Sequence, residues 1–235
     1  MLMITDNILL NTLLAMLTAV GAALITTPIV KAIAPHIGAV DIPKDDRRMH
    51  TKPMPLCGGI AIFLGFSVAM LLFSEMTAES WGIWLGCLAI VILGIVDDIF
   101  TLNAKLKFVL QFVAALIPVC FGLTMEHINV FGYNLHLGWF AYPLTLLWIV
   151  ALTNAVNLID GLDGLACSVT TVGSVALFAV GVIVSSPAIM ITSASLFGAC
   201  AGFLPYNFNP AKIFMGDTGA MFLGYTVAAL SVYSF

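Results

Sequence analysis

Charged residues are scarce in this sequence. Asp, Glu, Lys and Arg make up 9% of its 235 residues, whereas hydrophobic residues make up 61%. A soluble globule needs many more polar side chains to cover its surface. The composition therefore excludes a soluble globular protein and predicts an integral membrane protein.

Cysteine is also scarce, and its pattern is uninformative. The five cysteines are odd in number, fall mostly inside apolar runs and form no C-x-x-C pair. We interpret them as small apolar packing residues and expect neither a disulfide framework nor a zinc site.

Long runs without charge take up most of the chain. A stretch of about 20 apolar residues is enough to cross a bilayer as a helix. The sequence predicts an all-α polytopic membrane protein with about eight transmembrane helices, at 8–30, 58–74, 81–96, 106–122, 139–156, 165–184, 187–204 and 218–235. Between Ile128 and Leu137, alternation around Gly132 predicts a short external β-hairpin.

Basic residues are absent from every second loop. If the N-terminus lies outside, the cytoplasmic segments are 31–57, 97–105, 157–164 and 205–217. All eight basic residues then lie inside the cell or in the first turn of a helix that enters from inside: Lys31, Lys44, Arg47, Arg48, Lys52, Lys105, Lys107 and Lys212. Cytoplasmic loops carry such an excess of Lys and Arg, so this orientation is expected.

The aspartates gather at the cytoplasmic ends of the runs. Asp97 and Asp98 follow one apolar run directly. Two adjacent carboxylates repel each other unless a cation or proton lies beside them, and such oxygen ligands suit Mg²⁺ or Mn²⁺. A solvated helix end is the alternative interpretation.

A second polar group follows the fifth apolar run. Asn154, Asn157, Asp160 and Asp163 recur at every third residue, and side chains at that spacing are neighbours on a helix. Capping of the next helix would explain Asp163 alone. The repeated spacing therefore favours a binding surface.

A third carboxylate, Asp217, lies between Gly216 and the last apolar run. The N-terminus of a helix attracts phosphate, and a carboxylate beside it can hold a metal that bridges phosphate oxygens. Asp217 is therefore the best candidate for a metal ligand. A helix N-cap is the alternative.

Basic side chains close to these acids are candidates for binding phosphate. Arg48 and Lys52 precede a proline-stiffened re-entry into the membrane, and Lys105 and Lys107 follow the Asp97-Asp98 pair. Positive-inside anchoring and snorkelling toward headgroups are the competing explanations for these charges.

Four motifs together resemble the polyprenyl-phosphate N-acetylhexosamine-1-phosphate transferases, enzymes of the glycosyltransferase family 4 type. The motifs stand in the family's order, with the third and fourth highly specific. They are Arg-Arg-Met-His-Thr-Lys-Pro-Met-Pro with Gly58-Gly59, Val-Asp-Asp with Lys105 and Gln111, Asn-Ala-Val-Asn-Leu-Ile-Asp-Gly-Leu-Asp-Gly-Leu from Asn154, and Phe-Met-Gly-Asp-Thr-Gly from Phe214.

The resemblance implies transfer of a sugar 1-phosphate from a UDP-sugar to undecaprenyl phosphate, with Mg²⁺ (or Mn²⁺) and release of UMP. It implies that Asp97 or Asp98 deprotonates or orients the lipid phosphate and that Asp217 holds the metal. The implied substrate-binding residues are Arg48, His50, Lys52, Lys105, Lys107, Asn154, Asn157, Asp160, Asp163, Asn207 and Phe214, with the Phe214 ring near uracil.

The version of the first motif favours UDP-N-acetylglucosamine over UDP-N-acetylmuramoyl-pentapeptide as the donor. The expected role is the first step of a cell-envelope polysaccharide such as a teichoic acid linkage unit or an O-antigen. We expect residues 1–235 to form a single transferase domain in the bacterial cytoplasmic membrane that binds no nucleic acid, with a homodimer as one option for its assembly.

Two features depart from the family pattern. Ala220 stands where serine is usual, and no His-x-His-His loop or further helices follow within the 235 residues. An inactive truncated member that serves as a scaffold or subunit is therefore an alternative. A small transporter is a weaker alternative, because the acidic residues of a transporter would lie in the middle of its membrane spans.

Overall fold

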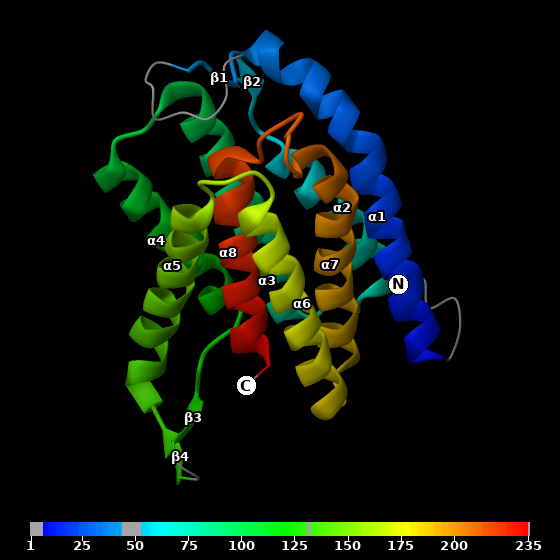
Figure 1. Cartoon of the computed structure of the whole chain (residues 1–235). Coiled ribbons are helices and arrows are strands. Elements are labelled where there is room, and N and C mark those ends of the chain that lie inside the picture. The colour runs from blue at the N-terminus through cyan, green and yellow to red at the C-terminus, as the bar shows by residue number, and fades with distance from the viewer. Residues whose placement is uncertain (1–6, 44–52, 131–132, 235) are drawn as a thin grey trace.

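The structure, a computed structural model, describes residues 7–43, 53–130 and 133–234. This part of the chain holds eight α-helices that run side by side as a bundle (Figure 1). They are α1 (Ile8–Ile33), α2 (Gly59–Phe73), α3 (Ala78–Phe100), α4 (Ala104–Cys120), α5 (Ala141–Ile159), α6 (Leu165–Ile183), α7 (Pro187–Asn207) and α8 (Gly216–Tyr233). Each of the eight predicted apolar runs thus corresponds to one helix.

The helices differ from the predicted runs mainly at their ends. The prediction ended the third run at Val96, but α3 continues to Phe100, so that Asp97 and Asp98 lie in its last turn. A helix can extend into polar sequence where its terminal groups find partners, and the Asp97 carboxylate accepts a hydrogen bond from the Leu102 N–H just beyond α3.

Five segments in the described part are long and apolar enough to cross a membrane. They include α1, α3, α5, α6 and α7, while α2 is apolar but shorter. The protein is therefore a mostly helical, multi-pass membrane protein, and spanning by all eight helices stays a prediction.

Helix α8 forms the centre of the bundle. It packs mainly against α3 and α5 and also contacts α2 and α6, and most of its side chains are buried. The close approach depends on glycine: a Cβ atom on Gly59 of α2 or Gly94 of α3 would collide with the backbone at the start of α8. The first turn of α8 is thus held by backbone contacts from two sides.

Two small antiparallel sheets lie at opposite ends of the bundle (Figure 1). Strands β1 (Val40–Asp41) and β2 (Met54–Pro55) pair at one end, and β3 (His127–Val130) pairs with β4 (Tyr133–His136) at the other. The predicted hairpin is confirmed, although its position outside the cell is still a prediction.

Two 3₁₀ turns complete the described elements: η1 (Ala34–Ile37) follows α1, and η2 (Gly138–Phe140) precedes α5.

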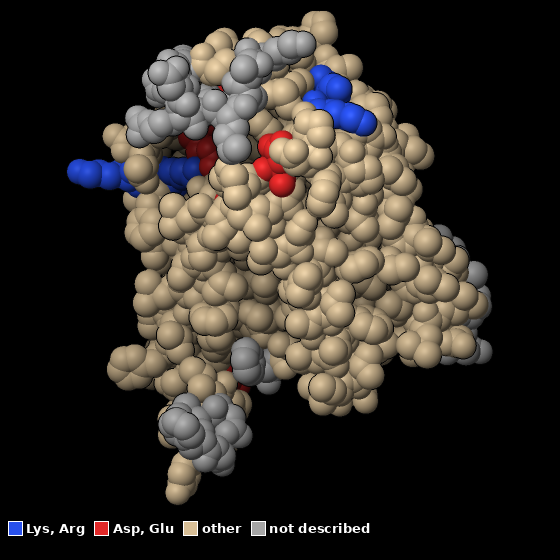
Figure 2. All heavy atoms as spheres, in the orientation of Figure 1, with Lys and Arg blue, Asp and Glu red and all other residues tan. Residues whose placement is uncertain are grey.

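Figure 2 shows one face of the molecule, on which Lys and Arg appear only near the β1–β2 end, close to Asp and Glu side chains. The middle of the face carries no charge, as expected for a surface in contact with lipid.

Candidate functional site

Aspartates from two distant motifs meet at the β1–β2 end of the bundle, around Lys107 of α4. The Lys107 Nζ atom lies 2.7 Å from Oδ2 of Asp97 and 2.7 Å from Oδ1 of Asp217. Asp97 is 6% exposed, and the Lys107 side chain is largely covered. One lysine therefore balances two carboxylates that would otherwise repel each other.

Asp217 has a second partner from α5. Its Oδ1 atom also accepts a hydrogen bond from the Asn157 Nδ2 amide at 2.5 Å. Asp217 lies in the first turn of α8, where the helix dipole favours a negative charge. Asn157, Lys107 and Asp217 thus form one polar cluster drawn from three helices.

Asp98 points to different partners from those of Asp97. Its carboxylate accepts hydrogen bonds from the Asp217 and Thr218 backbone N–H groups, at 2.8 and 3.2 Å, and from the Thr218 hydroxyl at 2.6 Å. The Cys57 thiol donates a further, weaker bond at 3.4 Å. Both oxygens of Asp98 are therefore occupied by protein donors.

Asn154 lies one turn deeper than Asn157. Its side-chain amide donates to Gln111 Oε1 of α4 at 2.7 Å and to the Val150 carbonyl at 2.8 Å. Gln111 in turn donates to the Met221 sulfur of α8 at 3.2 Å. Asn154 therefore links α5 to α4 and α8 in the described structure.

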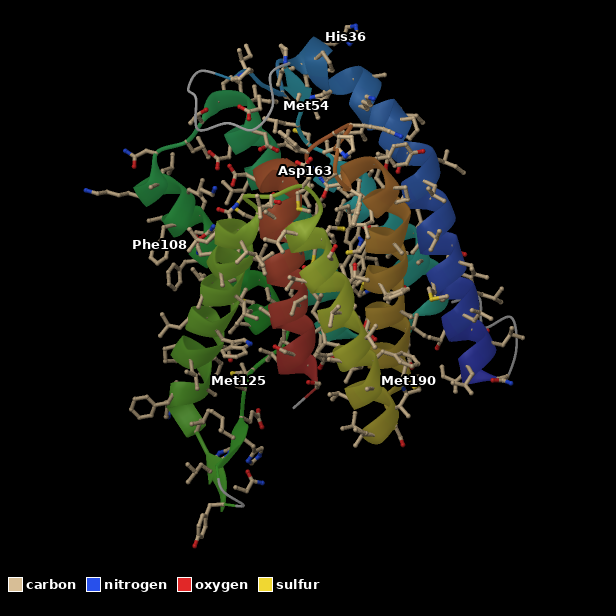
Figure 3. The ribbon with its side chains drawn as sticks, in the orientation of Figure 1. His36, Met54, Phe108, Met125, Asp163 and Met190 are labelled. Carbon is tan, nitrogen blue, oxygen red and sulfur yellow. The ribbon has the colours of Figure 1, made fainter. Side chains whose placement is uncertain are left out.

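Asp163 fixes the loop before α8. Its Oδ2 atom accepts hydrogen bonds from the Ala211 N–H at 3.0 Å and from the Asn209 amide at 3.2 Å. The N-cap of α6 is Gly164 and makes no side-chain cap bond, so Asp163 does not serve as that helix's N-cap. Figure 3 shows Asp163 at the same end of the molecule as Met54, away from Met125 and Met190.

Asp160 follows α5 directly, on the same side of the bundle as the other carboxylates. Burial, together with the charges of Asp217, Asp98 and Asp163, raises the pKa of Asp160 to about 7. A carboxyl group so close to other acids is therefore ready to exchange a proton or to receive a cation near neutral pH.

Asn207 and Phe214 lie at the two ends of the loop between α7 and α8. Asn207 is 2% exposed, and its amide donates to the Ile213 carbonyl at 3.1 Å, while its Oδ1 atom has no hydrogen-bond partner among the described residues. The Phe214 backbone N–H donates to the Pro55 carbonyl at 2.9 Å. The first and fourth motifs are thus joined through their backbones.

The remaining predicted residues lie apart from this cluster or outside the description. Lys105 is exposed at the start of α4. Arg48, His50 and Lys52 lie outside the described residues. Their predicted contacts with substrate stay predictions.

A comparison with protein families matches residues 80–235 to the model described as glycosyl transferase family 4. The chain belongs to glycosyl transferase family 4. It is 46% identical, over 97% of its length, to a "probable undecaprenyl-phosphate N-acetylglucosaminyl 1-phosphate transferase" of Bacillus subtilis, and covers 64% of that protein.

Two further family 4 relatives carry related names. A "decaprenyl-phosphate N-acetylglucosaminephosphotransferase" of Mycobacterium tuberculosis is 37% identical over 92% of this chain and 59% of the relative. A "phospho-N-acetylmuramoyl-pentapeptide-transferase" of Caldicellulosiruptor bescii is 32% identical over 95% of this chain and 74% of the relative. The chain thus spans about three fifths of the length of the first two relatives.

The carboxylate oxygens of this site are of the type that binds a divalent metal. Mg²⁺ is usually held by one or two carboxylates together with phosphate oxygens and water. Asp217 and Asp97 supply such carboxylates next to Asn157, although Lys107 contacts both acids in the structure. The described residues contain no group of three or more His, Cys, Asp or Glu that could hold a metal by themselves. A divalent metal at this cluster would therefore need further oxygen ligands besides Asp97 and Asp217.

Cys57 and Thr218 were not predicted as partners of Asp98. Both lie inside recognised motifs, next to Gly58 and Asp217, but their residue types gave no signal of their own. A thiol and a hydroxyl are common in apolar runs, and only their contacts distinguish them.

Proposed function

We propose that this family 4 protein transfers N-acetylglucosamine 1-phosphate from UDP-N-acetylglucosamine to undecaprenyl phosphate and releases UMP. The observation that supports this most strongly is the convergence of Asp97, Asp217 and Asn157 on Lys107 at one end of an apolar bundle. A soluble nucleotide and a lipid headgroup can meet only at such a membrane boundary.

In the proposed reaction, an oxygen of the lipid phosphate forms a bond to the phosphorus that carries the sugar. The bond from that phosphorus to the oxygen of UMP breaks, and UMP leaves with the electron pair. Mg²⁺ (or Mn²⁺) would neutralise the diphosphate charge. The protein need supply mainly position and charge, because phosphoryl transfer depends on these.

The polar cluster around Lys107 provides both the position and the charge that this reaction needs. Asp217, with Asn157, would hold the metal and the diphosphate at the start of α8. Lys107 would pair with phosphate oxygens once they displace a carboxylate from it. Asp97, which has one oxygen on Lys107, would orient the lipid phosphate or keep it deprotonated. Asp160 and Asp163 would border the nucleotide, together with Phe214.

The relatives support the choice of substrates. Two of the three names specify N-acetylglucosamine and a polyprenyl phosphate, and the third specifies N-acetylmuramoyl-pentapeptide. The Bacillus subtilis relative is 46% identical over 97% of this chain, whereas two muramoyl-pentapeptide relatives are 32% identical over 95% and 38% identical over 76% of it, and this difference favours N-acetylglucosamine. A role at the first step of a cell-envelope polysaccharide, such as a teichoic acid linkage unit or an O-antigen, in the bacterial cytoplasmic membrane follows from these substrates.

The decisive experiment uses the full chain in detergent with labelled UDP-N-acetylglucosamine, undecaprenyl phosphate and MgCl₂. We expect a labelled lipid product and an equal amount of UMP, with neither formed by Asp217→Ala. UDP-N-acetylmuramoyl-pentapeptide, offered in place of the first donor, should give much less product.

Absence of product from correctly folded wild-type protein would overturn the proposal and favour an inactive subunit of the same fold. Product from the pentapeptide donor alone would instead correct the choice of substrate. Folding is checked by size-exclusion chromatography and circular dichroism.

A further inference from the structure

Asp98 has an environment that its neighbour Asp97 lacks. All of the hydrogen bonds described for its carboxylate come from the protein: the Asp217 N–H, the Thr218 N–H and hydroxyl, and the Cys57 thiol. Because both oxygens already accept bonds from the protein, a substrate group could reach this carboxylate only by displacing one of those donors.

Three of these bonds come from the first turn of α8. Free N–H groups at a helix start are usually satisfied by a side chain just before the helix, whereas here the acceptor comes from α3, 119 positions earlier in the sequence. A charged acceptor is especially effective there, because the N-terminal end of a helix is electropositive. Asp98 thus caps α8 from another helix.

The sequence around Asp217 fits this cap. Gly216 has φ +70°, and a Cβ atom on it would lie 2.8 Å from the Asp98 carboxyl carbon. A side chain at this position would therefore push the Asp98 carboxylate off the start of α8. The glycine before Asp217 leaves room for Asp98.

Cys57 connects the same carboxylate to the segment before α2. Its backbone has φ +63°, and its side chain is fully buried. The next two residues, Gly58 and Gly59, donate backbone hydrogen bonds to the Phe214 and Met215 carbonyls, each at 3.0 Å. Asp98 therefore lies where the end of α3, the segment 57–59 and the start of α8 meet.

We propose that Asp98 is a positioning residue: its carboxylate fixes the start of α8 and so sets where the Asp217 side chain points. Asp97 is then the carboxylate of the pair that shares Lys107 with the Asp217 side chain. This inference rests on the proposed function for the role of Asp217, but the cap itself can be tested without catalysis.

The first test measures the reactivity of the Cys57 thiol in the full chain, in a Cys120→Ser background that removes the exposed cysteine. Alkylation by N-ethylmaleimide is followed at the Cys57 peptide by mass spectrometry. We expect Asp98→Asn and Thr218→Val to raise the rate about tenfold or more, since hydrogen bonds to a charged group are lost. Asp97→Asn is the matched control and should react as slowly as the parent.

The second test measures activity as a function of Mg²⁺ and pH. If Asp98 acts through Asp217, Asp98→Asn and Thr218→Val should both need several-fold more Mg²⁺ for half-maximal rate. The KM for UDP-N-acetylglucosamine at saturating Mg²⁺ should change little, and the acidic side of the pH–rate profile should stay in place.

Other outcomes overturn the inference. If Asp98→Asn abolishes the acidic side of the profile while Thr218→Val behaves as wild type, Asp98 is the proton acceptor. If neither variant changes the Cys57 rate, the cap does not hold α8. If Asp98→Asn does not fold, the rate of Cys57 alkylation in Thr218→Val alone decides whether the cap holds α8. Inactive wild-type protein with the expected thiol pattern would refute the proposed function but not the cap.

Discussion

Lys107 is the residue on which the charge balance of the site depends. It lies 2.7 Å from one oxygen each of Asp97 and Asp217, and both acids would repel each other without it. Its exposed neighbour Lys105 makes a matched control on the same helix.

Replacing Lys107 by methionine should lower the free energy of unfolding by about 1–3 kcal/mol, because two partly buried carboxylates lose their cation. A divalent cation can then take the place of the lysine ammonium group. Added MgCl₂ should therefore raise the melting temperature more in Lys107→Met than in wild type. Thermal unfolding in detergent, with and without MgCl₂, measures both effects. Lys105→Met should match wild type, and an equal Mg²⁺ effect in all three proteins would contradict the prediction.

Asp160 should make the free energy of unfolding depend on pH. Its folded-state pKa of about 7 is higher than the ordinary value of 3.8, so the folded protein favours the protonated form. The stability that this group contributes is complete below about pH 4 and is lost as pH rises toward 7. Unfolding measured in metal-free buffer from pH 5 to 7.5 should therefore show wild type losing more stability with rising pH than Asp160→Asn. Parallel curves for the two proteins would show that Asp160 does not titrate in this range.

At the scale of elements, α8 is positioned by close backbone contact. Gly59 of α2 approaches Gly219, and Gly94 of α3 approaches Thr218, so closely that a Cβ atom on either would collide. The aspartate at the start of α8 is thus placed by the helices around it as much as by its own loop.

Gly59→Ala should destabilise the protein by about 1–3 kcal/mol and reduce transferase activity further, because α8 must shift away from α2. Gly173 of α6 is the matched control, since a Cβ atom there would meet nothing within 4 Å. Gly173→Ala should be neutral or stabilising by about 0.5–1 kcal/mol. Chemical or thermal unfolding of both variants checks this, and equal losses would refute the specific role of the α2–α8 contact.

At the scale of the whole molecule, the β1–β2 end carries the polar cluster and the opposite end carries the β3–β4 hairpin. The exposed side chains of Trp139 and Phe140 lie next to that hairpin, as is common for aromatic residues at a membrane interface. The positive-inside rule then predicts that the polar cluster faces the cytoplasm.

Single cysteines introduced into a Cys120→Ser background test this orientation. Asn134→Cys in β4 should react with a membrane-impermeant maleimide in intact cells, because the hairpin is expected outside. Lys212→Cys, in the loop before α8, should react only after lysis. The reverse pattern would invert the proposed topology and place the site outside the cell.

Much of the fold follows from local composition. The eight apolar runs correspond to eight helices, and the alternation around Gly132 corresponds to the hairpin. Both signals are local, since each depends on residues that are neighbours in the chain. The end of α3 was placed too early because charged residues were taken to end the helix, whereas Asp97 and Asp98 are satisfied within it.

The sequence by itself determined that this is a membrane protein with carboxylates at the ends of its helices, because apolar length and the cost of buried charge are properties of the chain. Only the tertiary structure shows that Asp97 and Asp98 have different partners. Successive residues on an α-helix point about 100° apart, so the two acids face different neighbours. Asp97 meets Lys107 of α4, and Asp98 meets the backbone at the start of α8.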